Sequence, residues 1–238
     1  MDARANLRIL PAAVPLDVLY SDNHLLAVAK PAGVPCVPDS SGHETLLDQV
    51  RAWLREDGAK EGNVYVGVVH RLDRPVSGVM LFARTSKAAA RLSEQFRQSE
   101  TRKLYWAICT GKLPGPEGRV EHWLAKRGGR NVVSAHAHEV PGGRFARTAW
   151  RVAGPALDGT GSWVELSPET GRPHQLRVAM ASLGCPLLGD VKYGAPQKLP
   201  DRSIALHARR LTVEHPTRHE PLELECPPPD REWWRAVR

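Results

Sequence analysis

One carboxylate of this chain is enclosed by cations, in the segment VVHRLDRPVSGVMLFAR at residues 68–84. Asp73 lies between Arg71 and Arg74, just before a predicted Ser-Gly turn and a strongly apolar run. Two cations nearby favour the ionised form of a carboxylic acid. Such a group suits a nucleophile or an electrostatic anchor better than a general acid. The motif alone is also typical of a solvated surface turn, so the choice depends on the rest of the chain.

The overall composition is compatible with a nucleic-acid partner. The chain has 238 residues, of which 42% are hydrophobic, so it is long and apolar enough to bury a substantial core. Its net charge is +7, with 25 arginines against 8 lysines, and its pI is about 9.5. Arginine grips phosphate and stacks on bases through its planar fork. GC-rich coding produces the same excess, so charge alone leaves RNA or DNA binding an open alternative.

Cysteine usage and hydropathy indicate a cytoplasmic protein. The four cysteines lie far apart without paired spacing, which argues against a zinc knuckle or a compact disulfide framework. Two prolines and an aspartate interrupt the apolar stretch at residues 1–20, which makes it a poor signal peptide. No apolar run approaches the ~20 residues needed to span a bilayer. We therefore expect reduced thiols and no membrane association.

The elements around Asp73 are short strands joined by irregular connections. After an N-terminal arm at 1–17, the apolar patterns predict strands at 24–33, 79–84, 103–113, 147–154, 162–169, 203–216 and 222–227. Residues 114–144 are rich in Gly, Arg and His, and we expect a hairpin or a basic loop there. Because strands outnumber helices and do not alternate with them, the expected fold class is α+β with a mixed, mostly antiparallel central sheet.

Helical spacing of apolar residues predicts helices at 45–57, 86–100 and 173–184, and a short closing helix at 231–237. Thr45 and Ser86 are the expected N-caps of the first two. Pro173 is expected in the first turn of the third helix and Gly184 just after its end. We find no repeat and no linker, so one compact domain flanked by helices and loops is expected.

Five segments, taken in order, resemble a known family. HRLDRPVSG at 70–78 resembles the signature of the RluA-type pseudouridine synthases. The other four are DNHLLAVAKPAGVP at 22–35, RKLYWAICTG at 102–111, ETGRPHQLRVAMASLGCPLLGDVKYG at 169–194 and SIALHARRLTVEHP at 203–216. The resemblance covers roughly residues 18–230. It implies that residues 18–238 form one pseudouridine-synthase-type catalytic domain.

The resemblance implies that the protein converts uridine to pseudouridine within an RNA chain. In this reaction the uracil is detached from ribose at N1 and rejoined through C5, with no cofactor and no catalytic metal. Asp73 matches the catalytic aspartate of the family. Whether this carboxylate attacks the base or the ribose C1′ stays open, since either route needs an ionised carboxylate aimed at the nucleoside.

Four further positions match family site residues. Arg177 matches the arginine that pairs with the catalytic carboxylate. Tyr105 matches the aromatic residue that stacks on the target uracil and handles protons through its hydroxyl. Leu206 matches an apolar residue that closes the pocket. Arg71 matches the residue that fills the gap left by the extruded base, which must leave its stack to react.

The remaining candidates are weaker. His70 and His174 are expected to donate hydrogen bonds within the two signature loops, with a purely structural role as the alternative. Arg172 and Lys30 are candidates for RNA phosphate contacts, against plain surface roles. A basic RNA clamp is expected from the residues Lys126, Arg127, Arg130, Arg144 and Arg147.

Two positions depart from the family pattern, which usually has threonine where this chain has Val76 and histidine where it has Ala179.

The ~20 residues before the first matched strand leave no room for the separate N-terminal RNA-binding domain of many relatives. We therefore expect a monomer that modifies an rRNA or tRNA stem-loop through the catalytic domain itself.

Two other function classes remain as alternatives. One is a catalytically silent RNA-binding or ribosome-assembly factor on the same scaffold; intact Asp73, Tyr105 and Arg177 argue against it. The other is a hydrolase that uses Asp73 with a metal held by histidines. Its candidate ligands are either His136 and His138 or His215 and His219. The lack of nearby acidic ligands, and Pro216 just after His215, argue against it.

Overall fold

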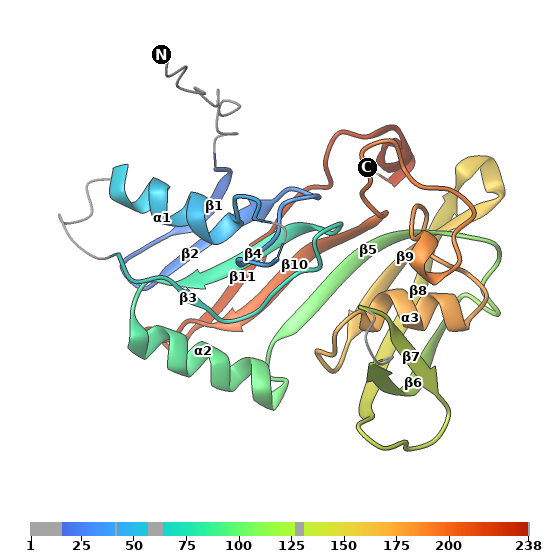
Figure 1. Cartoon of the computed structure of the whole chain (residues 1–238), viewed down its shortest axis with the longest axis horizontal. Helices are drawn as coiled ribbons and strands as arrows, with labels where there is room; N and C mark the ends of the chain where they lie inside the picture. The colour runs from blue at the N-terminus through green and yellow to red at the C-terminus, as the bar shows by residue number, and fades with distance from the viewer. Residues whose placement is uncertain (1–15, 41, 57–63, 127–130, 238) are drawn as a thin grey trace, which may run out of the picture.

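One mixed sheet runs through the molecule in the computed structural model, which describes residues 16–40, 42–56, 64–126 and 131–237 (Figure 1). The strands are β1 (Val18–Ser21), β2 (Leu25–Lys30), β3 (Gly67–Val68), β4 (Ser77–Ala83), β5 (Arg102–Thr110), β6 (Glu117–Lys126), β7 (Val133–His136), β8 (Arg144–Ala156), β9 (Gly161–Pro168), β10 (Leu206–Glu214) and β11 (Pro221–Glu225). Residues 1–15 of the expected arm, together with Arg127 and Arg130, lie outside the described residues.

The sheet order is β1-β2-β4-β10-β5-β9-β8-β6-β7, with β3 paired to β4 and β11 to β10. Among the described residues, β4 and β10 form the only parallel pair between named strands, over His207↔Ser77 and Ala208↔Gly78. This arrangement confirms the predicted α+β class with a mixed, mostly antiparallel sheet.

Three α-helices cover the sheet: α1 (Leu46–Glu56), α2 (Ser86–Gln98) and α3 (Gln175–Ser182). The short 3-10 turns are η1 (Leu157–Gly159), η2 (Val191–Tyr193) and η3 (Glu232–Val237). The predicted helices at 45–57, 86–100 and 173–184 are therefore confirmed, and the closing helix is a 3-10 helix.

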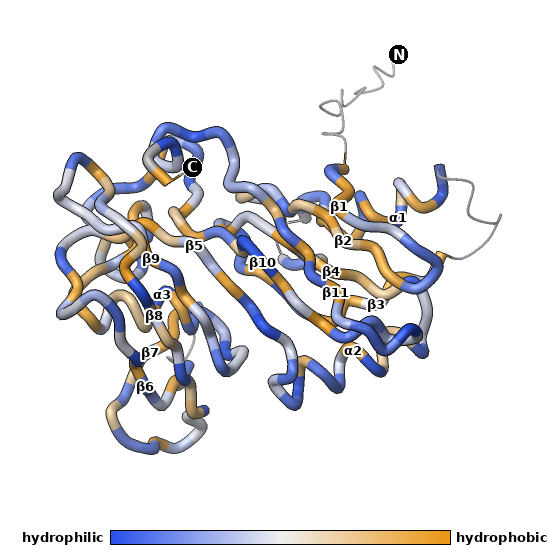
Figure 2. Tube along the Cα trace, turned by 180° about the vertical axis from the view of Figure 1, so that it is seen from behind, coloured by the Kyte–Doolittle hydropathy of each residue, from blue (hydrophilic) through white to orange (hydrophobic). Residues whose placement is uncertain are grey.

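Buried strand β4 separates two cores, because successive side chains of a strand point to opposite faces. Met80 and Phe82 pack in the larger core with residues of α1 and α3, whereas Val79 and Leu81 pack in a second core with α2. Figure 2 shows hydrophobic residues along β2 and β4, and alternating hydrophobic and hydrophilic residues along α2. The predicted buried strand at 79–84 is confirmed and is central to the fold.

Helix ends agree with the sequence at α1 and differ at α2 and α3. Thr45 caps α1, since its hydroxyl accepts from the backbone N of Asp48 at 3.2 Å. The cap of α2 is Thr85, whose hydroxyl accepts from Ala88, because Ser86 is already helical. Pro173 lies before α3, because His174 adopts a left-handed backbone (φ 55°) and the helix begins only after it.

Within the basic region at 114–144, strands β6 and β7 pair as a hairpin and β8 begins at Arg144. Of the two predicted possibilities, a hairpin or a basic loop, the described residues therefore form the hairpin. The predicted Ser-Gly turn is wrong, since Ser77 and Gly78 begin β4. Ser77 makes a 2.9 Å hydrogen bond to Nδ1 of His207 across the parallel pair. This pair therefore brings the end of the Asp73 loop against the start of β10.

Gly78 is required by this close approach. Its φ is +121°, and a Cβ there would lie 2.3 Å from the carbonyl oxygen of Ala208. Only glycine adopts such a backbone without strain and leaves room for the neighbouring strand.

We predict that Gly78→Ala lowers the free energy of unfolding by about 2 kcal/mol or more, because strain and overlap with β10 add. Gly142→Ala is the matched control, since Gly142 also has a positive φ (71°) but a Cβ added there would meet no atom within 4 Å. The control is expected to lose only about 1 kcal/mol. Urea unfolding measures both variants, and equal losses would contradict the assigned close contact.

Candidate active site

A buried lysine holds the backbone of the loop that carries Asp73. Lys30, at the end of β2, donates from Nζ to the carbonyl oxygens of Pro31 (2.9 Å), Arg74 (3.2 Å) and Val76 (2.7 Å). Lys30 is 1% exposed, and burial lowers its pKa to about 8. Because three backbone carbonyls take up its N–H groups, the expected phosphate contact of Lys30 is wrong: the side chain holds the loop instead.

The Asp73 loop is also tied to the Lys-Pro-x-Gly turn. The backbone N of Gly33 donates to the carbonyl of Arg74 at 2.8 Å, and Nε of Arg74 donates to the carbonyl of Gly33 at 2.8 Å. The backbone N of Val76 donates to the carbonyl of Asp73 at 3.0 Å. These bonds fix the backbone of Asp73 independently of its side chain.

The side chain of Asp73 meets the guanidinium of Arg177, as the motif predicts. Nη1 of Arg177 donates to Oδ2 of Asp73 at 3.0 Å, while Nε and Nη2 donate to the two oxygens of Asp190 at 2.7 Å each. Arg177 is 5% exposed and Asp190 1%. Burial opposes the charge of Arg177, but the hydrogen bonds and charges of Asp190 and Asp73 outweigh it and raise its pKa.

The two oxygens of Asp73 differ in their surroundings. Oδ2 accepts from Arg177 and lies 3.8 Å from Nε2 of His174. Oδ1 has no hydrogen-bond partner within the described part of the chain. The side chain is 28% exposed, so the carboxylate is held through Oδ2 and is in part accessible to solvent.

Tyr105 and Leu206, the predicted aromatic and aliphatic site residues, lie on neighbouring strands. Tyr105 on β5 is in register with Ala208 of β10, and Leu206 is in register with Ala107. Burial raises the pKa of Tyr105, and the negative charge of Asp73 adds to the rise. The phenol therefore keeps its proton at neutral pH, and its oxygen makes no hydrogen bond among the described residues.

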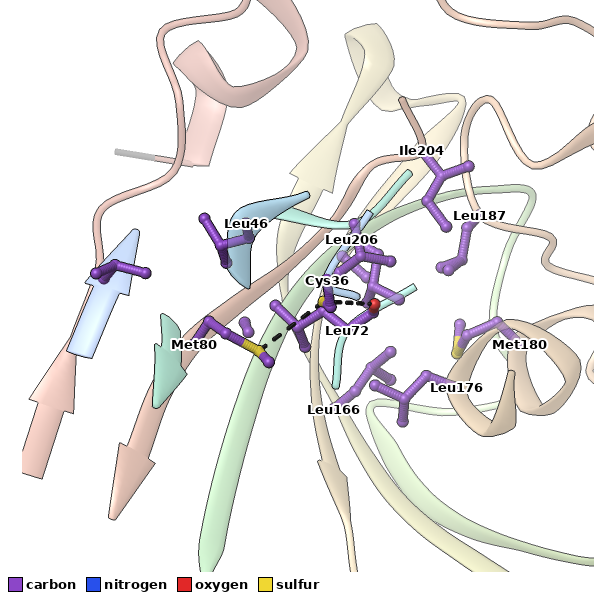
Figure 3. Packing of buried hydrophobic residues seen from close by; sticks show 14 of the residues in the cluster. Cys36, Leu46, Leu72, Met80, Leu166, Leu176, Met180, Leu187, Ile204 and Leu206 are labelled. Atoms are coloured by element: carbon purple, nitrogen blue, oxygen red, sulfur yellow. Dashed lines mark hydrogen bonds between the residues drawn. The ribbon is translucent and has the colours of Figure 1, made fainter. Parts of the chain in front are cut away.

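Leu206 belongs to the larger core, and Figure 3 shows it above Leu72, with Leu166 and Leu176 nearby. In the same view the thiol of Cys36 donates a hydrogen bond to the carbonyl of Leu72 at 3.2 Å. Leu72 directly precedes Asp73 in the sequence. Leu206 and Tyr105 thus belong to the larger core, beside Leu72 and beside Leu176, which directly precedes Arg177.

Comparison with known proteins agrees with this geometry. Residues 24–182 match the family model described as RNA pseudouridylate synthase. The chain belongs to the RluA-type RNA pseudouridine synthases. It is therefore an RNA pseudouridine synthase, an isomerase, and the resemblance seen in the five motifs is confirmed.

Individual relatives cover most of this synthase. An uncharacterized RNA pseudouridine synthase of Bacillus subtilis, YhcT, is 36% identical over 93% of the chain and 71% of its own length. The dual-specificity RNA pseudouridine synthase RluA of Yersinia pestis is 35% identical over 88% and 97%, respectively. The structure of human RNA pseudouridylate synthase domain containing 4 superposes with a TM-score of 0.75 at 28% identity, over 90% of this chain and 89% of that one.

Other predicted residues of the synthase lie around this centre. Arg71 is exposed, with no ion pair or side-chain hydrogen bond among the described residues. Arg172 is half-buried and donates from Nε to the carbonyl of Phe145 at 2.9 Å. Lys126 and Arg144 are exposed at the ends of neighbouring strands β6 and β8.

Arg147 differs from Lys126 and Arg144, the other clamp candidates among the described residues, because carboxylates already balance its charge. Its Nε lies 2.7 Å from Glu121 and its Nη1 3.5 Å from Glu169, and its guanidinium lies 5.3 Å from the ring centre of Phe145. An arginine paired in this way adds little net positive charge to an RNA-binding face.

The ring of His70 packs against helix α2. Its Nε2 accepts from the backbone N of Leu81 at 2.8 Å, and its ring stacks on Phe96 of α2 at 4.8 Å. Burial lowers its pKa to about 3. The expected donation from this ring nitrogen is wrong, since the neutral nitrogen accepts, and the contacts fit the structural alternative.

Sequence reasoning assigned no role to two residues of the centre, Asp190 and Tyr193. Both belong to GDVKYG at 189–194, which the resemblance did include, so the motif carried the signal. Asp190 precedes η2 and Tyr193 ends it, and the ring of Tyr193 lies under the guanidinium of Arg177 at 5.0 Å.

The hydrolase alternative finds no support in the described residues. They contain no group of three or more His, Cys, Asp or Glu side chains arranged to hold a metal. His215 is hydrogen-bonded to Asp22 at 2.8 Å, and His219 to Glu214 at 2.9 Å.

No helix in the described ranges is long and apolar enough to cross a membrane.

We predict that Arg177→Lys lowers turnover by at least about 100-fold, because one ammonium cannot hold Asp190 through two bonds and Asp73 through a third. The loss of unfolding free energy is expected to be about 2 kcal/mol, since a cation still faces Asp190. Arg151→Lys is the control, because Arg151 is exposed and paired with Glu165 at 2.6 Å. This substitution should change neither the turnover nor the free energy of unfolding. Turnover and urea unfolding are measured together, and near-normal turnover of Arg177→Lys would contradict the three-bond arrangement.

Proposed function

We propose that Asp73 is the catalytic carboxylate of this synthase and that it acts on a flipped-out uridine in structured RNA. The observation that supports this is the asymmetry of the carboxylate: Oδ2 is bonded to buried Arg177, while Oδ1 is free among the described residues. An ionised, oriented oxygen of this kind is suited to attack or to proton transfer. Attack on the base and attack on the ribose remain equally compatible with it.

Tyr105 and Leu206 form the proposed pocket for the extruded uracil. The ring of Tyr105 supplies a face for the base, and Leu206 closes the pocket from the apolar side. Arg71 is exposed two residues before Asp73, which supports its proposed role of replacing the flipped base in the stack.

We propose an rRNA or tRNA stem-loop as the substrate. Relatives of this chain include a ribosomal large subunit pseudouridine synthase D of Xanthomonas campestris, 35% identical over 92% of the chain and 68% of its own length. Lys126 on β6, Arg144 on β8 and Arg172 before α3 are proposed to contact phosphates. Arg127 and Arg130, which lie outside the described residues, are proposed to do the same. His174 is taken up below.

The proposed acting unit is a monomer, with residues 18–238 as one catalytic domain preceded by the 1–17 arm. A cytoplasmic location is proposed with it. The four cysteines, which are all buried and free, support a reducing compartment.

We predict that Asp73→Asn abolishes turnover and leaves folding and RNA affinity close to the wild type, because the amide keeps the shape but loses the anionic oxygen. Release of tritium from total RNA labelled with 5-tritiated uridine, taken from cells that lack this protein, measures turnover. Asp158→Asn, an exposed aspartate in η1, is the control and should retain full activity. Retained activity of Asp73→Asn would refute the assignment, and no release by the wild type would favour a silent RNA-binding protein.

We predict that replacing Lys126, Arg127 and Arg130 by Gln reduces the slope of log affinity against log salt by about 2 to 3, since each lost phosphate contact removes about 0.7 to 0.9 units. Filter binding to bulk tRNA and ribosomal RNA measures the slope. Lys87→Gln with Arg97→Gln is the control, because these exposed residues lie on α2, which packs in the second core. An unchanged slope in the triple variant would remove the β6–β7 hairpin from the RNA-binding face.

A further inference from the structure

A chain of two hydrogen bonds and one longer polar contact runs from strand β7 to Asp73. The backbone N of Val133 donates to the phenol oxygen of Tyr193 at 3.0 Å. The same oxygen lies 2.6 Å from Nδ1 of His174. At its other end, Nε2 of His174 lies 3.8 Å from Oδ2 of Asp73.

The direction of these bonds determines where the imidazole carries its proton. The oxygen of Tyr193 already accepts from Val133, and the phenol proton has no other acceptor than Nδ1 among the described residues. A phenol oxygen can accept two hydrogen bonds, so the direction of the Tyr193–His174 bond is an assignment rather than an observation. We assign the phenol as the donor to Nδ1, which gives its proton an acceptor and places the proton of the neutral His174 ring on Nε2. Nε2 is the ring nitrogen that lies 3.8 Å from Oδ2 of Asp73.

The groups that face His174 also favour a neutral ring. Its side chain is only 8% exposed, and this burial is the main cause that lowers its pKa. Arg177 and Lys192 act in the same direction, while Asp73 and Asp190 oppose them. The imidazole therefore presents a neutral N–H donor, and Arg177 remains the cation beside the carboxylate.

Backbone strain places the ring at this point. His174 adopts φ 55° and ψ 14° as the residue before α3, and its side chain makes no capping hydrogen bond. A left-handed backbone is uncommon for residues other than glycine. Held strain next to a reactive group is an observation from which a functional role is inferred.

We propose that Tyr193 and His174 are positioning residues for Asp73: Tyr193 fixes the Nε2–H form of His174, which together with Arg177 restrains Oδ2 and leaves Oδ1 to meet the nucleoside. The proposal rests on the proposed role of Asp73. The 3.8 Å gap is longer than a hydrogen bond, and it shortens to one when Asp73 engages the substrate.

The same chain connects the active site to the basic hairpin. Val133 begins β7, and Nζ of Lys192 donates to the carbonyl of Asn131 at 2.9 Å, just before that strand. The hairpin therefore rests on η2, the turn that also carries Tyr193. Displacement of the hairpin would remove the N–H that orients the phenol.

The first test is Tyr193→Phe, which keeps the ring under Arg177 and removes the hydroxyl. With enzyme in excess over 5-tritiated total RNA from cells that lack this protein, the single-turnover rate constant should fall about 10-fold. The half-saturating enzyme concentration should stay within about 2-fold, because only the positioning of Asp73 changes. The proposal would be overturned by a normal single-turnover rate constant, or by a variant in which only the half-saturating enzyme concentration changes.

The second test compares His174→Gln with His174→Asn. A glutamine amide reaches the place of Nε2 and offers an N–H to Asp73, whereas an asparagine amide reaches only the place of Nδ1. The proposal predicts the faster single turnover for His174→Gln. A merely structural role predicts the reverse order, since asparagine tolerates the left-handed backbone better, and that order would overturn the proposal.

The third measurement is the tautomer itself, from nitrogen-15 spectra of the histidine rings at pH 7, with His174→Gln identifying the signal. The expected ring is protonated at Nε2 in the wild type and mixed in Tyr193→Phe; a wild-type ring protonated at Nδ1 or at both nitrogens would overturn the proposal. Asp73→Asn in the single-turnover assay distinguishes a failure of the positioning proposal from a failure of the proposed function. If it is inactive while Tyr193→Phe is normal, only the positioning pair fails; if Asp73→Asn is active, the proposed function fails.

Discussion

The shared guanidinium of Arg177 is the interaction on which the site depends. A buried cation without a partner destabilises a protein by several kcal/mol. Here Asp190 supplies two hydrogen bonds to Arg177, so the charge is balanced before Asp73 is counted. Asp73 can therefore change its bonding during a reaction without leaving Arg177 unpaired. Asp190 therefore has a structural role, and Asp73 remains available for the catalytic role proposed above.

Two buried cations fix Asp73 from different directions. Lys30 holds the backbone of its loop through carbonyl oxygens, and Arg177 holds its side chain. Lys30 comes from β2 and Arg177 from α3, elements that flank the larger core. Any shift between them would separate the backbone anchor from the side-chain anchor. The parallel contact at Gly78 limits such shifts, because it brings β4 and β10 close together just after the loop.

The elements with strong apolar patterns, β4 and α2 among them, were predictable because local hydrophobicity decides their burial. The β6–β7 hairpin was only one of two possibilities, since most of β6 is exposed or half-buried and its apolar signal is weak. Asp73 and Arg177 were found through motifs, but the bonds of Lys30 were not. Its carbonyl partners in the loop lie 44 and 46 residues away, and a lysine in a strand is normally expected to reach solvent. Long-range backbone contacts of this kind have no local signature.

The departures from the family pattern at Val76 and Ala179 follow from the same anchoring. Val76 is 2% exposed, and its backbone N and O are bonded to the carbonyl of Asp73 and to Lys30. The loop is therefore closed through the backbone of residue 76, and a hydroxyl on its side chain is not needed. Ala179 is buried within α3, two residues after Arg177. Side chains two apart on a helix do not share a face, so a small residue at 179 leaves the guanidinium in place.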